Sequence, residues 1–253
     1  MRFIVLAAGT GSRLRPLTHD VPKCLITLAR QSILERLLEQ ARSTHRFSEA
    51  VVITGYRAEQ VADFSHRWSA ARSLPVRLVN NERFMETNNS FSLYLARHLL
   101  DEGFVLADGD LVLDPRILAR VAASDRSSLA VDSSRALDAE AVKCELDDQR
   151  LVVGLSKEIP AHRAAAESIG LSRLDVGDAQ AMTRHMTALV QRGEFDVYYE
   201  RAYQDMLVDG WRPGLIDVAG LGWEEVDDHR DLEHARALVA GGAASGEAAL
   251  APG

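Results

Sequence analysis

The sequence has little cysteine and no long apolar run, and both absences exclude classes of protein. Its two cysteines, Cys24 and Cys144, do not have the spacing of a metal site, so we expect reduced thiols and a cytoplasmic location. No apolar run approaches the roughly 20 residues that a membrane-spanning helix needs. The N-terminus enters a short apolar segment at once and lacks the layout of a signal peptide. These features predict a protein that does not enter a membrane.

An excess of positive charge is also absent. The 253 residues carry a formal net charge of −8, which disfavours nonspecific binding to nucleic acid or to an anionic membrane. An anionic substrate must therefore be held by local arginine, lysine and metal, because the field of the whole protein repels it. Hydrophobic residues make up 47% of the chain and charged residues 26%, as is typical of a globular protein with a large core.

Apolar segments alternate with amphipathic ones in the first half of the chain, which predicts a mostly parallel sheet flanked by helices. The strands expected here are 3–6, 50–54, 76–79 and 103–106, and the helices are 32–43, 58–68 and a segment from 89 or 90 to about 100. Ligands of such sheets bind at the carboxyl ends of the strands.

The second half is less regular. The expected strands are 129–132, 141–145, 151–155 and 215–218, and the expected helices are 179–191, 197–208 and 231–239. No linker separates two independent domains, so we expect a single domain over residues 1–239. Residues 240–253 are rich in alanine and glycine with almost no large apolar residue, which predicts a flexible C-terminal tail.

Residues 6–25 carry the most informative pattern of the chain. They follow the first strand with small residues where the chain must turn, and Gly9 and Gly11 allow the backbone to come close to a ligand. Arg13, Arg15 and Lys23 place cationic donors around this loop, as a polyphosphate requires. We therefore interpret the loop as a cradle for a nucleoside triphosphate.

The two commoner glycine-rich loops do not match. A Walker A loop needs a Gly-Lys-Ser/Thr triplet, which does not occur here. The Rossmann dinucleotide signature needs a third glycine at the position that Leu14 occupies. A glycine-rich turn without a ligand would leave the clustered arginines and lysine unexplained.

Acidic residues form a second pattern. Asp110 follows a strand and a glycine, so its carboxylate should lie at the ligand end of the sheet. Glu225 and Asp227 point to the same side of an extended segment, so both could reach one ion. Taken alone, such an acidic pair before a helix is typical of an N-terminal cap. Beside a triphosphate loop, we interpret the three carboxylates as ligands of Mg²⁺.

The loop resembles a known family. The matching pattern is Leu-Ala-Ala-Gly-x-Gly-x-Arg-Leu-x-Pro-x-Thr followed by Pro-Lys, which is similar to the nucleotidyltransferases that join a nucleoside triphosphate to a sugar phosphate or phosphoalcohol. This resemblance implies a Rossmann-like three-layer sandwich of the nucleotide-diphospho-sugar transferase type, with a mixed, mostly parallel central sheet. In this family a strand-end Gly-Asp and a late Glu-x-Asp hold the catalytic Mg²⁺, and Asp110, Glu225 and Asp227 match those positions.

The acceptor motifs are most similar to one branch of that family. Residues 86–97, Glu-Thr-Asn-Asn-Ser-Phe-Ser-Leu-Tyr-Leu-Ala-Arg, resemble the cytidylyltransferases acting on phosphocholine and on small phosphonates such as 2-aminoethylphosphonate. The Gly-Thr that is usual in the sugar-specific relatives is missing. Residues 154–158 and 168–171 also resemble the phosphonate and phosphoalcohol branch.

The resemblance implies a role for each matching residue. An anionic oxygen of a phosphate or phosphonate would attack the α-phosphorus of CTP in line and expel pyrophosphate, which requires positioning rather than a general base. Lys23, Arg13 and Lys157 are expected to act on the α-phosphate, the triphosphate and the acceptor's phosphorus group respectively, although Lys157 could equally be a solvated lysine. The expected nucleotide-binding residues are Leu6, Ala7, Ala8, Gly9, Gly11, Thr87, Asn88 and Asp108. Asn88 could equally be a helix cap.

A dense aromatic and acidic segment is the candidate for the rest of the acceptor. Aromatic faces with nearby carboxylates suit a choline or aminoethyl cation, so we expect Asp196, Tyr198, Tyr199 and Glu200 to contact it. Helical spacing of tyrosines is also typical of a helix packing on its core.

Two alternatives remain open at this point. A sugar-1-phosphate nucleotidyltransferase would use UTP or dTTP, but the missing Gly-Thr and the lack of an added C-terminal region disfavour it. A non-catalytic, nucleotide-sensing relative should have lost Lys23 or a metal carboxylate, and all are present. The expected partners are CTP and a small acceptor, with no nucleic acid and no membrane, and a homodimer is left open.

Overall fold

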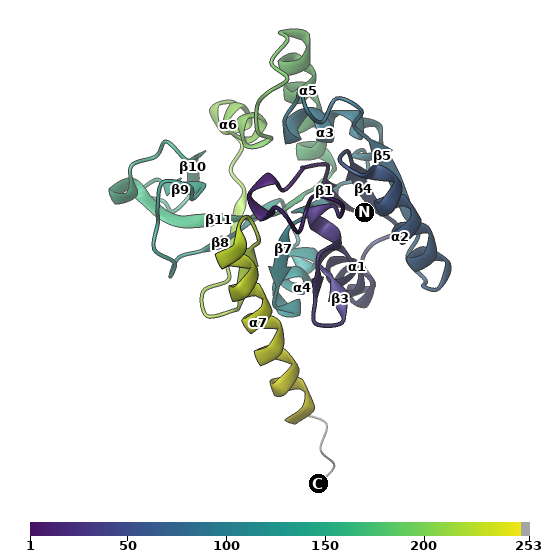
Figure 1. Cartoon of the computed structure of the whole chain (residues 1–253). Coiled ribbons are helices and arrows are strands. Elements are labelled where there is room, and N and C mark those ends of the chain that lie inside the picture. The colour runs from purple at the N-terminus through teal and green to yellow at the C-terminus, as the bar shows by residue number, and fades with distance from the viewer. Residues whose placement is uncertain (249–253) are drawn as a thin grey trace.

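The computed structural model describes the backbone of residues 1–248 and the side chains of residues 1–241. Along the chain the strands and helices are β1 (Arg2–Ala7), β2 (Thr27–Leu28), β3 (Gln31–Ser32), α1 (Ile33–Thr44), β4 (Ala50–Thr54), α2 (Ala58–Ala70), β5 (Val76–Asn80), α3 (Asn89–Leu95), β6 (Phe104–Asp108), β7 (Leu111–Leu113), α4 (Pro115–Ala123), β8 (Ser128–Asp132), β9 (Lys143–Leu146), β10 (Val152–Ser156), β11 (Ala164–Leu174), α5 (Val176–Gln191), α6 (Glu200–Val208), β12 (Gly214–Asp217), β13 (Trp223–Glu225) and α7 (His229–Ala248) (Figure 1).

The central sheet is mixed, with a parallel part built from the first half of the chain. Its strands lie in the order β10-β9-β11-β6-β1-β4-β5, and β8 joins β11 to β12. β1 lies between β4 and β6 and runs parallel to both, while β11 runs antiparallel to β6, β8 and β9. The carboxyl ends of β1 and β6 therefore meet at one edge of the sheet, which is where parallel sheets bind ligands.

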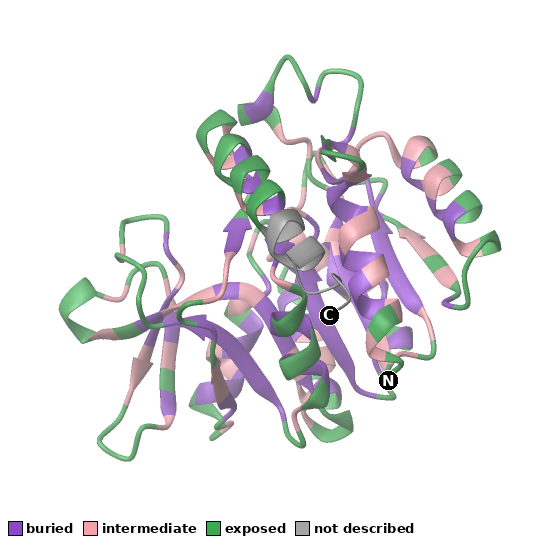
Figure 2. Cartoon of the chain, turned by 90° about the horizontal axis from the view of Figure 1, so that it is seen from below, coloured by how far each residue is buried: buried purple, intermediate pink, exposed green. Residues whose placement is uncertain are grey.

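Alternating side chains of β1 divide the core into two layers. Phe3 and Val5 pack against α1, α2 and α4 on one face of the sheet, whereas Ile4 packs against α3, α5 and α6 on the other. Figure 2 shows the central strands buried between helices whose outer faces are exposed. The predicted three-layer α/β sandwich is confirmed by this arrangement.

A third apolar cluster joins the last helix to the loop that follows β1. Leu232 and Val239 of α7 pack against Leu14, Ile26 and neighbouring residues, so α7 supports the loop from outside the sheet. In Figure 1 the yellow end of α7 extends away from the body. Among the residues that the structure describes, no helix combines the length and the apolar character needed to cross a membrane.

Local sequence signals place most elements correctly, and the differences have physical causes. β4 spans the predicted 50–54, and Ser32 caps α1 by accepting a hydrogen bond from the backbone N–H of Glu35. The helix predicted over 197–208 begins only at Glu200, because the amide groups of Asn88 and Ser90 hold the carbonyls of Phe195 and Val197 in an extended segment.

Among the strands and α-helices that the structure describes, six have no counterpart among the predictions, and α7 is longer than predicted. The additional elements are the strands β2, β3, β7, β11 and β13 and the helix α4. The predicted tail begins at Ala240, but α7 continues to Ala248. Residues 249–253 of that predicted tail lie outside the described residues.

Gly109 lies at the point where β6 comes closest to the end of β1. Its N–H donates to the carbonyl oxygen of Leu6 at 2.9 Å, and a Cβ atom at position 109 would overlap that same oxygen. Only glycine fits this approach, which places Asp108 and Asp110 directly beside the loop that follows β1.

We expect Gly109→Ala to lower the free energy of unfolding by about 1–3 kcal/mol, because the obstacle is backbone that cannot move aside. Urea denaturation measures the change. Gly9→Ala is the matched control, since a Cβ atom there meets no described heavy atom within 4 Å. It should change stability by less than about 0.5 kcal/mol. Equal stability of the two variants would show that β6 can shift away from β1.

Candidate active site

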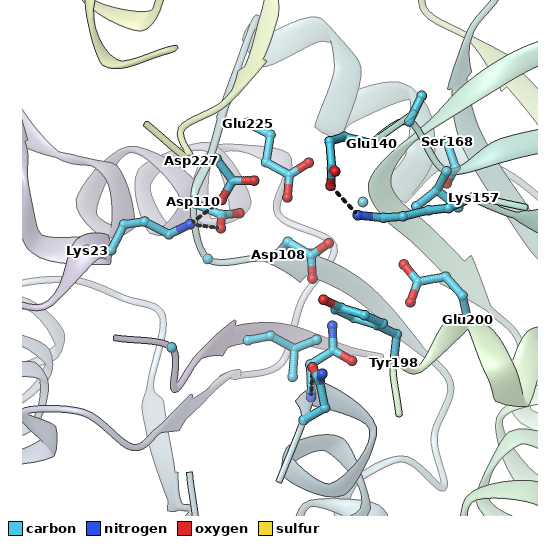
Figure 3. Close-up of a pocket in the computed structure, with 18 of the residues that line it drawn as sticks. Lys23, Asp108, Asp110, Glu140, Lys157, Ser168, Tyr198, Glu200, Glu225 and Asp227 are labelled. Carbon is cyan, nitrogen blue, oxygen red and sulfur yellow. Dashed lines mark hydrogen bonds and ion pairs between the residues drawn. The ribbon is translucent and has the colours of Figure 1, made fainter. Parts of the chain in front are cut away.

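A cavity of about 700 Å³ opens at the carboxyl ends of β1 and β6. It collects segments that are far apart in the sequence: the loop after β1, the turn after β6, the ends of β10 and β13, and the start of α6 (Figure 3). The predicted site residues that line it are Leu6, Ala7, Ala8, Gly9, Gly11, Arg13, Lys23, Thr87, Asn88, Asp108, Asp110, Lys157, Asp196, Tyr198, Glu200, Glu225 and Asp227.

The loop after β1 folds back over a lysine. Gly11 has a left-handed backbone conformation (φ 59°), and a Cβ atom there would come within 3.0 Å of the Cβ of Lys23. The hydroxyl of Thr18 closes the loop by donating to the Gly11 carbonyl at 2.7 Å. Gly9 lies on the open side of the same loop, where no described heavy atom approaches its Cβ position within 4 Å. The loop therefore presents backbone groups, rather than side chains, to the cavity.

The cations of this loop are paired with carboxylates on the opposite wall. Lys23 Nζ lies 2.5 Å from Asp110 Oδ2 and 2.9 Å from Asp227 Oδ1, and Arg13 Nη2 lies 2.7 Å from Asp227 Oδ2. Burial alone would lower the pKa of Lys23, but the two carboxylates raise it above its ordinary value. Burial would likewise raise the pKa of Asp227, yet Lys23 and Arg13 hold it below the ordinary value. Lys23 and Asp227 are thus charged.

A third carboxylate, Glu225, lies close to Asp110 and Asp227. β13 runs antiparallel to β7, and the N–H of Val226 donates to the Asp110 carbonyl at 3.1 Å, which brings the late Glu-x-Asp segment to the turn after β6. As a result, one oxygen each of Asp110, Glu225 and Asp227 lie within 4.8 Å of one another.

The donor set fits a hard divalent cation such as Mg²⁺. Asp110 Oδ1 is buried without a hydrogen-bond partner among the described residues, so one ligand oxygen is uncommitted. Burial, together with Asp110 and Asp227, raises the pKa of Glu225 to about 8, and a bound cation would reverse this shift by favouring the ionised form. The predicted set of Asp110, Glu225 and Asp227 is brought together, and its role as a metal site stays a prediction.

The opposite end of the cavity holds the second of the two lysines that line it. Lys157 follows the end of β10, and its Nζ lies 3.1 Å from Glu140 Oε2 and 5.7 Å from the centre of the Tyr198 ring. Asp196 accepts a hydrogen bond from the Asn88 amide at 3.2 Å. An ammonium, an aromatic face and carboxylates therefore surround one space (Figure 3).

Tyr199 differs from the other predicted acceptor residues. Its side chain is buried in the core rather than set in the cavity wall, and its hydroxyl donates to Asp108 Oδ2 at 3.2 Å. Gly170, which has φ 71°, lies so close on the other side of this carboxyl that a Cβ atom would overlap Oδ2. Burial and the neighbouring acids raise the pKa of Asp108 well above its ordinary value. The Tyr199 hydroxyl thus holds the Asp108 carboxyl in place from the side of the core.

Glu200 begins α6 and faces the cavity between Lys157 and Asp108 (Figure 3). Its Oε2 atom is shielded from solvent and has no hydrogen-bond partner among the described residues. Burial raises the pKa of Glu200 to about 7. A buried, unpartnered acceptor oxygen is costly, so this carboxyl is suited to a ligand that donates a hydrogen bond.

Thr87 and Asn88 line the same cavity as the loop after β1. Thr87 donates to the carbonyl of Arg83, and Asn88 Oδ1 accepts from the N–H of Asn89 as the N-cap of α3. Asn88 therefore caps a helix, as one of its two interpretations predicts, and also lines the cavity, while its role in binding a nucleotide stays a prediction.

Two basic residues in or next to the cavity are missing from the predictions. Lys143 is 4% exposed, and its Nζ donates to the carbonyls of Ala141 at 3.2 Å and of Lys157 at 2.9 Å, so it fixes the backbone that carries Lys157. Arg135 pairs with Glu224 at 3.0 Å and lies over the Trp223 ring. Composition could have indicated Lys143, because only three of the 29 basic residues are lysines.

Comparison with known proteins agrees with this geometry. Residues 3–170 match the family model of the MobA-like NTP transferase domain. A CMP-5'-(3-aminopropyl)phosphonate synthase of Streptomyces rubellomurinus is 32% identical over 251 residues, covering 93% of this chain, and the chain spans 38% of the length of that protein. A 2-aminoethylphosphonate cytidylyltransferase of Lancefieldella rimae is 27% identical over 209 residues, covering 81% of this chain and 76% of the relative.

Among solved structures, the CTP:phosphocholine cytidylyltransferase of Streptococcus pneumoniae superposes with a TM-score of 0.77 at 22% identity. The match covers 94% of this chain and 98% of the other. At this identity the likeness concerns the fold.

The raised pKa of Glu200 predicts a dependence of stability on pH. The folded protein keeps this proton up to about pH 7, whereas the unfolded chain loses it near 4.5, so stability should fall as pH rises between these values. Glu200→Gln removes this pH-dependent contribution to stability, because glutamine does not ionise. It should raise the free energy of unfolding at pH 8 by up to about 3 kcal/mol and change little at pH 4. Urea denaturation at both pH values measures it, with the exposed Glu158→Gln as control. A gain of equal size at both pH values would contradict the shift.

Proposed function

The chain belongs to the family of MobA-like NTP transferase domains, and from this premise we propose that it is a Mg²⁺-dependent cytidylyltransferase that transfers CMP from CTP to a small phosphonate or phosphoalcohol. Both curated relatives are named for cytidylyl chemistry on aminoalkyl phosphonates, which supports CTP as the donor and an acceptor of this class.

The observation that carries the proposal is the arrangement of charge along one cavity. Lys23 and Arg13 lie beside the glycine loop at one end, and Lys157 lies at the other. The carboxylates of Asp110, Glu225 and Asp227 lie between the two ends (Figure 3). A site with separate cations at both ends and acidic metal ligands between them suits a reaction that joins two anions.

The reaction itself requires positioning. An oxygen of the acceptor's phosphonate or phosphate, already ionised at neutral pH, forms a bond to the α-phosphorus of CTP. The bond from that phosphorus to the bridging oxygen breaks, and pyrophosphate leaves with the electron pair. The backbone of Gly9 and Gly11 with Arg13 would hold the triphosphate, Lys23 the α-phosphate and Lys157 the acceptor.

Asp110, Glu225 and Asp227 would hold the metal. A divalent cation bound there supplies charge neutralisation for the triphosphate, which the protein's net charge of −8 makes more necessary. Nucleotide selection would fall to the loop that carries Thr87 and Asn88, whose amide offers both a donor and an acceptor.

The acceptor end favours a molecule with a positive group. Glu200 Oε2 has no hydrogen-bond partner in the part of the chain that the structure describes, Tyr198 is 54% exposed, and Asp196 lines the same cavity. An ammonium group of an aminoalkyl phosphonate could donate to Glu200 while its phosphorus group meets Lys157. This arrangement supports an aminoalkyl phosphonate or a phosphocholine-like acceptor over a neutral sugar phosphate.

Pyrophosphate release with Mg²⁺ tests the proposal directly. We expect turnover with CTP, and not with UTP, dTTP, ATP or GTP, when 2-aminoethylphosphonate, 2-hydroxyethylphosphonate, phosphoethanolamine or phosphocholine is the acceptor. Asp110→Asn should lower kcat by at least about a hundredfold, because it removes a metal ligand. Turnover of glucose-1-phosphate with UTP or dTTP would instead assign the protein to the sugar branch, and nucleotide binding without any turnover would support a sensing role.

The role of Lys157 can be separated from that of the nucleotide loop. Lys157→Met should raise KM for the acceptor about tenfold to a hundredfold, since a charge-assisted hydrogen bond is lost, and should leave KM for CTP within about twofold. Arg163→Met is the matched control, because Arg163 is also paired with a glutamate but does not line the cavity. Steady-state kinetics with each substrate varied measure both constants. A larger effect on KM for CTP would place Lys157 at the triphosphate.

A further inference from the structure

The cations expected to bind the triphosphate are paired with the carboxylates expected to bind the metal. Lys23 contacts both Asp110 and Asp227, and Arg13 contacts Asp227 through its second oxygen. Figure 3 shows Lys23 reaching across the cavity to these two carboxylates. Both carboxylate oxygens of Asp227 are thus paired with Lys23 and Arg13, the cations that the proposed function assigns to the triphosphate.

The remaining oxygens of the cluster are not engaged in this way. Asp110 Oδ1 has no hydrogen-bond partner among the described residues, and Glu225 forms no ion pair with any cation that the structure describes. A cation entering the cluster therefore meets uncommitted oxygens first and must then compete with Lys23 for Asp110 and Asp227. Two positive charges cannot share these carboxylates at close range without strong repulsion, because the site is largely buried.

The stem of Lys23 packs against the glycine loop. A Cβ atom built at Gly11 would lie 3.0 Å from Lys23 Cβ and 3.4 Å from Lys23 Cδ. The ammonium is therefore carried past the loop to the carboxylates, and its transfer to a triphosphate held by the loop would involve rotation about the outer side-chain bonds. Arg13 is more exposed than Lys23, with 61% of its side chain accessible against 15%.

We propose that Lys23 and Arg13 are internal counter-ions of the metal ligands, and that metal binding transfers them to the triphosphate. The inference rests on the proposed function, because it assumes that the cavity takes a metal and a nucleoside triphosphate. Its consequence is positive coupling: metal releases the cations that the nucleotide needs, and nucleotide removes the cations that compete with the metal. Asp227, which holds both cations, is the residue through which the two ligands are coupled.

The metal arm of the test uses Mn²⁺ alone, with no nucleotide and no turnover. Lys23→Gln should bind Mn²⁺ about tenfold or more tightly than the wild type, because its competitor is gone. Lys157→Gln is the comparison variant: it removes an equal charge from the same cavity, but Lys157 is ion-paired with Glu140 and acts on Glu225 only at a distance, so its loss should tighten Mn²⁺ binding less than the loss of Lys23. Arg13→Gln, at an exposed position, should give a smaller gain and serves if Lys23→Gln is unstable.

The nucleotide arm measures CTP binding in EDTA by calorimetry. Asp227→Asn should tighten metal-free CTP binding, because it frees both cations, and the gain should shrink in an Arg13→Gln background. Simple repulsion between Asp227 and the triphosphate would give the same gain in both backgrounds.

Several results would overturn the inference. These are weaker or unchanged Mn²⁺ binding by Lys23→Gln, equal tightening by Lys157→Gln, or a background-independent effect of Asp227→Asn. Failure of the proposed function would be seen separately, as absence of CTP-dependent turnover in the wild-type protein.

Discussion

The close approach of β6 to the end of β1 is the constraint on which the site depends. At Gly109 the two backbones are so near that no side chain fits between them. The turn that carries Asp110 is therefore placed beside the loop that carries Gly9 and Gly11. β7 continues from this turn and pairs with β13, which brings Glu225 to the same point. One backbone contact thus determines where the loop after β1 and the acidic cluster meet.

This concentration of acids is unfavourable for the folded state. Burial raises the pKa of Glu225 to about 8 and of Glu200 to about 7, and that of Asp108 lies well above its ordinary value. Such shifts mean that the folded protein resists ionisation of groups that the unfolded chain ionises freely. Clustered acids with raised pKa values are typical of functional sites, where cationic ligands remove the repulsion. The cavity is thus less stable without its ligands than a site of neutral residues would be.

The sequence predicts well what depends on local signals and poorly what depends on distant contacts. The loop after β1 and strand β4 carry their own patterns, so their positions and the three-layer fold were predictable. β11 was not, because its eleven residues lack an apolar alternation and its structure depends on three partner strands. α4 has a local signal in Asp114 and Pro115, an N-cap followed by proline. Tyr199 could not be separated from Tyr198, since only the extended segment before α6 decides which ring faces the cavity.

Lysine is rare in this chain, and its three positions have one physical explanation in common. An ammonium group is a compact charge with three donors, whereas a guanidinium group is planar and wide. Lys23 fits between two carboxylates, Lys143 between two backbone carbonyls, and Lys157 between a carboxylate and a ring. Arginine serves most of the exposed ion pairs, where its width is no obstacle. The use of lysine in a chain that otherwise uses arginine therefore marks the places where a cation must enter a narrow space, and all three belong to this one cavity or to its support.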